Sequence, residues 1–251
     1  MLPSLLAIAS GSAFVVWWWS RERTPWRWFW LGGLIWLVGA IVLKGAAAAV
    51  TLPLIERLKS TTSPRTFEII SALHSGSMTG VFEMGTTLAF AVRIRSMSSS
   101  SSRMIAVGFG AGALEAWFVG LLGLLMAWVL ANVHHPRIDA LRAEQAATIP
   151  PRLAILLPAV ERVIATLCHA GSRVLVLSSV ADARARLFVW AFSMMFAVDA
   201  WASFASSEKI SPWWIMFGLS PLAIVSALVL RRAAGRISCV LSAKGSSSGR
   251  R

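Results

Sequence analysis

The chain is poor in charge, and poorest in negative charge. Charged residues make up 14% of its 251 positions, with 11 Asp and Glu against 24 Lys and Arg, whereas charged residues are about 25% of a soluble domain. Hydrophobic residues make up 57% of the chain, and its mean hydropathy is +0.69. This balance argues against an ordinary soluble domain and favours a chain embedded in lipid.

Cysteine is scarce and tyrosine is absent. The two cysteines, Cys168 and Cys239, form no close-spaced motif, which excludes a disulfide framework and a cysteine-based zinc site, so we expect two free thiols. The chain has 13 tryptophans. Most of them cluster at the ends of apolar runs, and we interpret them as interfacial anchors rather than an aromatic ligand cage. These clustered tryptophans are Trp17, Trp18, Trp19, Trp26, Trp28, Trp30, Trp213 and Trp214.

Apolar runs long enough to cross a bilayer recur along the sequence. They predict an all-α fold, a polytopic transmembrane helix bundle in residues 1–230, followed by a basic, disordered cytoplasmic tail in residues 231–251. The first run is expected to be a retained helix, because it lacks the basic start and small-residue cleavage site of a signal peptide. The seven expected spans cover about 2–20, 27–50, 68–92, 104–131, 153–177, 186–206 and 212–230.

Basic residues lie between the apolar runs and in the tail, which is typical of topology determinants and contacts with anionic lipid headgroups. With the N-terminus outside, the inner segments hold 14 Lys and Arg and the outer loops hold 7. This bias predicts an N-out, C-in orientation. We therefore expect an integral, multi-pass protein of the cell membrane whose partner is the lipid bilayer, and no nucleic acid partner, despite a net charge of +13.

Four acidic residues fall inside four different expected spans: Glu83, Glu115, Glu161 and Asp199. Carboxylates are costly in a bilayer and usually face the interior of a bundle or a polar cavity. We therefore expect these four side chains to converge on one interior site. The alternative is that they pair with Lys44, Arg162 or Arg173 and only hold helices together.

The fifth span carries Glu161, His169 and Arg173. Glu161 and His169 are about 80° apart around a helix and roughly 12 Å apart along it, so they can border one cavity but cannot touch. Arg173 lies one turn beyond His169 on the same face, and we expect it to reach towards a membrane surface. The histidine is either part of the site or a simple bridge between helices.

Small residues recur every four positions in the fourth span, beside Glu115, and predict close approach of another helix. They are Gly108, Gly112, Ala116 and Gly120.

In the third span, three threonines surround Glu83 at helical spacing and predict a polar patch on its face. They are Thr79, Thr86 and Thr87. The alternative is that these hydroxyls bond to carbonyls of their own helix.

Four short motifs follow one another along these spans. "FEMGTT" begins at Phe82, and "GAGALEA" ends at Ala116. Glu161 and Arg162 precede His169, and Asp199 stands alone in the sixth span. Their order resembles the YhfC-type intramembrane peptidases, relatives of the glutamic CAAX-protease-like group. The corresponding family motifs are Phe-Glu-Glu-x-x-Arg, Gly-His-Gly-Gly-Ile-Glu-Ala, Glu-Arg with a later His, and His-x-x-x-Asp. The early run "WLGGLIWLVGAIVLK", which ends at Lys44, is also similar to the family's entry region.

Six polar positions of these motifs match, and four differ: Met84, Thr87, Ala111 and Met195. The resemblance implies an intramembrane endopeptidase that takes a membrane peptide or protein as substrate. In the resembled mechanism a glutamate activates water, while His and Arg groups stabilise the oxyanion. The implied catalytic residues are Glu83, Glu115, Glu161, His169 and Asp199. A metal ion would need about three protein ligands, so the cofactor stays open.

The four replacements leave two other hypotheses. One is a catalytically degenerate homologue that binds a membrane partner in the same cavity. The other is a small proton-coupled transporter, in which intramembrane carboxylates change protonation state. The sequence shows neither an internal repeat nor a clearly broken helix pair, which argues against the transporter.

Overall fold

The computed structural model describes residues 1–133, 135, 137–140 and 155–248, and within these ranges the chain is helical apart from turns and contains no strand. The all-α fold predicted from the sequence is confirmed. The elements are α1 (Leu2–Glu22), α2 (Arg27–Trp36), η1 (Leu37–Leu43), α3 (Lys44–Leu58), α4 (Pro64–Thr79), η2 (Gly80–Met84), α5 (Gly85–Arg93), η3 (Arg95–Ser98), α6 (Ser101–Asn132), α8 (Leu157–Ala181), α9 (Ala185–Ser207) and α10 (Pro212–Ser248).

Six helices of the described chain are long and apolar enough to cross a membrane: Leu2–Glu22, Arg27–Leu58, Ser101–Asn132, Leu157–Ala181, Ala185–Ser207 and Pro212–Gly235. A polytopic membrane bundle is therefore confirmed. The expected third span lies on the helical course from α4 through η2 to α5, which is not among these six. The number of seven spans, like the orientation, stays a prediction.

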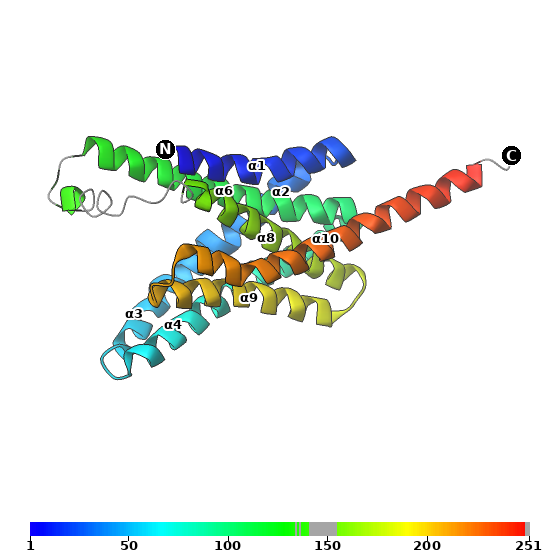
Figure 1. Ribbon diagram of the computed structural model, residues 1–251. Coiled ribbons are helices and arrows are strands. Elements are labelled where there is room, and N and C mark those ends of the chain that lie inside the picture. Colours follow the sequence, from blue (N-terminus) through cyan, green and yellow to red (C-terminus); the bar gives the residue numbers. More distant parts are fainter. Residues whose placement is uncertain (134, 136, 141–154, 249–251) are drawn as a thin grey trace.

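The helices α2 to α5 leave one end of the bundle and return to it. Met97, in η3 after α5, packs in the same core cluster as Trp18 of α1 and Trp28 of α2. The indole of Trp18 also donates to the carbonyl of Ser102 at the start of α6, at 3.2 Å. The turn between α3 and α4 lies far from this end (Figure 1). This antiparallel course is the geometry that a seventh crossing, from α4 through η2 to α5, requires.

Small residues allow the helices of the core to approach closely. A Cβ on Gly108 would lie 2.6 Å from Ala170 Cα, and one on Gly112 would lie 2.8 Å from Thr166 Cα, both in α8. Further along α6, a Cβ on Gly120 would lie 2.9 Å from the carbonyl oxygen of Ser4 in α1. The predicted small-residue stripe is confirmed, and it faces two different helices.

The tryptophans divide into two groups. Trp17, Trp26 and Trp30 are about half exposed, as anchors in lipid would be. Trp18 and Trp28 are only 2% and 5% exposed and belong to the main hydrophobic core. The interpretation of all these residues as interfacial anchors is wrong for this buried pair, because helix periodicity turns them towards α6 and not towards lipid.

Two further expectations concern the cysteines and the tail. Cys168 is a free, buried thiol, whereas the side chain of Cys239 lies outside the described part.

Helix α10 continues past residue 230 to Ser248, beyond the bundle's end (Figure 1). The segment expected to be a disordered tail is thus largely helical, while residues 249–251 lie outside the described ranges. The division of the chain at residue 230 stays a prediction.

Candidate functional site

Two π-helical segments, η1 and η2, pack against each other where the polar groups meet. A Cβ on Gly39 of η1 would lie 2.9 Å from the carbonyl oxygen of Phe82 and 3.2 Å from Glu83 Cα in η2. A π turn changes the face that the following residues present, and such turns are frequent at functional sites. The close approach brings Lys44, the first residue after η1, near Glu83, with Nζ 4.0 Å from Oε1.

Asp199 of α9 meets Lys44 on the other side. Glycines at positions 76 and 80 leave room for α9 against α4 and η2, because a Cβ at either one would overlap the Phe196 carbonyl or the Phe192 ring. Lys44 Nζ donates to Asp199 Oδ2 at 2.8 Å and to Thr79 Oγ1 at 2.5 Å, and the Thr79 hydroxyl also donates to Asp199. This contact joins the third expected span to the sixth.

Glu115 of α6 is held by two residues of α8. Arg162 Nη1 donates to Glu115 Oε1 at 2.6 Å, and His169 Nε2 contacts Glu115 Oε2. The other terminal nitrogen of Arg162 donates to Glu161. Gly108 and Gly112 let α8 lie against the face of α6 next to Glu115. Arg162 and His169 can therefore contact this carboxylate directly.

Arg173 lies at the centre of the network. Its Nη1 donates to His169 Nδ1 at 2.6 Å, and its Nη2 donates to Glu83 Oε2 at 3.3 Å. Because Nδ1 accepts a hydrogen bond, the ring carries its proton on Nε2 and donates it towards Glu115. The expectation that Arg173 reaches a membrane surface is wrong: the side chain is 0% exposed. Its partners, His169 of the same helix and Glu83 of η2, hold it inside the bundle.

The five residues that the sequence indicated are brought together. Glu83, Glu115, Glu161, His169 and Asp199 all line one cavity of about 330 Å³. Glu161 and His169 do not touch, as helix geometry predicted, and are connected through Arg162 and Glu115. The carboxylates both line the cavity and pair with Lys44, Arg162 and Arg173, so the two alternatives left open by the sequence coexist.

Two features of this site were missed. The threonine patch around Glu83 is only partly as expected, because Thr79 bonds to Lys44 and Asp199 instead, while Thr87 donates to the backbone carbonyl of Glu83. The bond from Thr87 is the alternative that the sequence left open. Lys44 was expected only as a possible partner of a carboxylate, and its position between Glu83 and Asp199 was missed. Its signal was a lone ammonium group inside an apolar run.

The side chains around the cavity decide whether it could hold a metal ion. Within the described chain, no three His, Cys, Asp or Glu side chains are arranged to hold one. Both oxygens of Glu115 and both ring nitrogens of His169 already have partners. Where the resembled motifs carry histidine, Ala111 and Met195 offer no nitrogen or oxygen ligand. These residues do not fit a catalytic metal site, which needs about three protein ligands and an open position.

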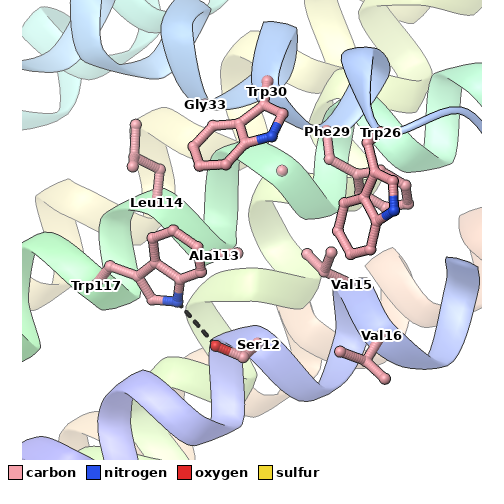
Figure 2. A pocket seen from close by; sticks show the side chains of 11 residues that line it. Ser12, Val15, Val16, Trp26, Phe29, Trp30, Gly33, Ala113, Leu114 and Trp117 are labelled. Atoms are coloured by element: carbon pink, nitrogen blue, oxygen red, sulfur yellow. Dashed lines mark hydrogen bonds between the residues drawn. The ribbon is translucent and has the colours of Figure 1, made fainter.

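A different hollow, of about 150 Å³, lies between α1, α2 and α6. Figure 2 shows Trp30 and Trp117 on one side of it and Val16 on the other, with the Trp117 indole donating to Ser12 Oγ at 2.8 Å. No ionisable side chain lines it. It offers no acid, base or nucleophile and is not part of the candidate site.

The comparisons with known proteins agree with the motif pattern. The chain matches the family model described as YhfC intramembrane metalloprotease over residues 5–218. No curated protein and no solved structure matches it. The matched region contains every residue of the network around Arg173, and it covers most of the chain. The chain is thus a member of the YhfC intramembrane metalloprotease family.

Proposed function

We propose that this protein is an intramembrane peptidase that cleaves a membrane peptide in the cavity around Glu83 without using a metal ion. The observation that carries the proposal is the convergence of four carboxylates, two cations and one histidine on a single cavity within the helix bundle, with the buried Arg173 paired to Glu83 beside it. Intramembrane ionisable groups are costly and usually functional. A cluster of this size exceeds what the pairing of two helices requires.

Glu83 is the best candidate for the general base. Its carboxylate is 95% buried, and its Oε1 lies 4.0 Å from Lys44 Nζ, too far for a direct hydrogen bond. A water molecule can therefore be hydrogen-bonded to this carboxylate oxygen without displacing a bond to Lys44. Glu115 is less suitable, because Arg162 and His169 hold both of its oxygens.

The hydrolytic step uses groups that already line the cavity. Glu83 takes a proton from water, the water oxygen bonds to the peptide carbonyl carbon, and the carbonyl oxygen becomes an oxyanion. Lys44 has three N–H donors, of which Thr79 and Asp199 take two, so the third can meet this oxyanion. Collapse breaks the C–N bond, and the leaving amine receives the proton from Glu83.

The remaining wall of the cavity supports a peptide substrate of membrane origin. Apolar side chains including Trp36, Phe118 and Met195 line it beside the charged groups. An apolar residue on each side of the scissile bond would remain in an environment similar to lipid. His169 and Arg162 act as positioning residues that fix Glu115 and the shape of the cavity.

The test uses the full-length protein reconstituted in liposomes with a library of membrane peptides, and mass spectrometry detects the products. Glu83→Gln should lower the cleavage rate about 100-fold or more, because it removes the base. The matched control is Glu56→Gln at the exposed end of α3, which should cleave like wild type. Cleavage by Glu83→Gln at the wild-type rate would contradict the assignment.

A catalytically degenerate protein that binds a membrane partner is the second candidate. The observation that favours it is the presence of Ala111 and Met195 where the resembled motifs carry histidine. Under this alternative the protein retains a library peptide intact, and Glu83→Gln leaves the products unchanged because there are none. Any turnover by wild-type protein that depends on Glu83 rules it out.

A further inference from the structure

A second cavity, of about 490 Å³, lies between α1, α6, α8 and α10. We call it the arginine crevice, because Arg21 and Arg231 line it together with apolar residues from all four helices. Its volume lies in the range of roughly 300–1,000 Å³ that is usual for ligand pockets. None of the residues of the candidate peptidase site lines it.

Most N–H donors of the two arginines have no partner among the described residues. Arg21 lies in the last turn of α1, and only its Nε approaches an acid, Glu22 Oε1 at 3.4 Å. Among the described residues, Arg231 has neither a hydrogen bond nor an ion pair. Two guanidinium groups at one cavity match the charge and geometry of a phosphate, because each offers paired N–H donors.

The rest of the crevice is apolar and reaches the lipid-facing surface. Phe14 stacks on Phe109, with ring centroids 5.3 Å apart, and Trp17 meets the same Phe109 ring edge-on. Trp17 is 50% exposed, and Ala227 is also exposed. Among the residues whose side chains the structure describes, none fills the space beside Gly235, where a Cβ would have no neighbour within 4 Å.

Both arginines lie towards the C-terminal ends of their apolar helical segments, Leu2–Glu22 and Pro212–Gly235. In the predicted orientation these are the inner ends, where anionic lipid headgroups attract basic residues. A phospholipid with a phosphate at this depth can place an acyl chain along the apolar wall below it. A soluble phosphate compound would leave that wall uncovered.

We propose that the arginine crevice binds one anionic phospholipid, with its phosphate on Arg21 and Arg231 and an acyl chain against Phe109 and Leu230. The proposal is independent of the peptidase function. Part of the site, from Ala227 to Gly235, lies beyond the residues that the family model matches.

Native mass spectrometry of the full-length protein in detergent tests this proposal, with phosphatidylglycerol, phosphatidylcholine or glycerol phosphate added. We expect one retained phosphatidylglycerol, weaker binding of phosphatidylcholine, and no competition by glycerol phosphate. Removing both charges in R21Q/R231Q should weaken retention, with about fivefold lost for each arginine. The matched control is R57Q/R65Q, which removes two exposed arginines near the turn between α3 and α4.

A second variant tests the apolar part of the site. Ala227→Phe fills the crevice from an exposed position and should reduce lipid retention without changing either arginine. Equal retention of phosphatidylcholine, displacement by glycerol phosphate, or unchanged binding in both R21Q/R231Q and Ala227→Phe would overturn the proposal. A folded elution profile and helical circular dichroism for each variant exclude loss of the fold as the cause.

Discussion

Arg173 reaches Glu83 across the interior of the bundle, with Nη2 3.3 Å from Oε2 and both side chains at least 95% buried. The pair joins α8 to η2, and its second guanidinium nitrogen fixes the ring of His169. Removing one partner of a buried pair leaves an uncompensated charge, whereas removing both costs much less. Stability and site geometry therefore depend on the same contact.

Arg173→Met should lower the free energy of unfolding by about 3–5 kcal/mol, because it removes the guanidinium partner of the buried Glu83 carboxylate and leaves it Lys44 at 4.0 Å, beyond direct hydrogen-bond distance. The double variant E83Q/R173M should recover part of this loss. Unfolding of the purified protein in mixed micelles, followed by circular dichroism, measures both values. Arg93→Met, at an exposed position of α5, serves as control. A loss no larger than that of this control would show that the pair carries no stability.

Lys44 and Asp199 should be energetically coupled, because Nζ and Oδ2 are 2.8 Å apart and both groups are only partly exposed. A double-mutant cycle with Lys44→Met and Asp199→Asn should give an interaction energy of about 0.5–3 kcal/mol. The same unfolding measurement supplies the four values. Strictly additive effects would mean that each residue acts through other neighbours.

The sequence was sufficient to predict that the carboxylates converge. Charge is so costly in lipid that Glu83, Glu115 and Asp199, on separate apolar helices, have few alternatives to a shared interior. The stripe from Gly108 to Gly120 likewise indicated a helix contact, since small residues at one helical face have no comparable use against lipid. Both inferences follow from the properties of lipid as the solvent around the helices.

The partners of these groups were not predictable in the same way. Helix periodicity placed Arg173 on the face of His169, but it did not tell whether that face meets lipid or η2. The π turns η1 and η2 change the register of Lys44 and Glu83, and no residue pattern marks them. Thr79 bonds to Asp199 because α9 lies close to α4 and η2 at positions 76 and 80. That contact depends on the packing of distant segments.

The close contact of α6 and α8 can be tested with one substitution at two positions. Gly108→Ala should destabilise the protein by about 1–3 kcal/mol, because its Cβ would lie 2.6 Å from Ala170 Cα. Gly45→Ala meets nothing within 4 Å and should be neutral or stabilising by roughly 0.5–1 kcal/mol. Thermal unfolding of both variants decides the matter. Equal shifts would contradict the packing argument.

The predicted orientation places the N-terminus outside and the end of α10 inside. A reporter that is active only outside should be inactive when fused after Gly235 and active when inserted between Leu58 and Pro64, in the turn from α3 to α4. Seven crossings that start from an outer N-terminus require both results. Activity after Gly235 together with inactivity in the turn would reverse the orientation, and equal activity at both sites would remove one crossing.

A metal site should be obtainable by restoring one histidine of the resembled motif. Met195 lines the cavity one turn before Asp199, so Met195→His adds an imidazole to the cavity that His169 and the carboxylates also line. We expect this variant to bind Zn²⁺ and gain thermal stability with it, since the new imidazole is a ligand without a partner and carboxylates of the cavity can exchange a cationic partner for the ion, which gives about three ligands. Val189→His, at a lipid-exposed position of the same helix, is the control and should not respond. Zn²⁺ should leave the wild-type protein unchanged as well. Stabilisation of wild type that disappears in Glu115→Gln would show that the present donor set does hold a metal ion.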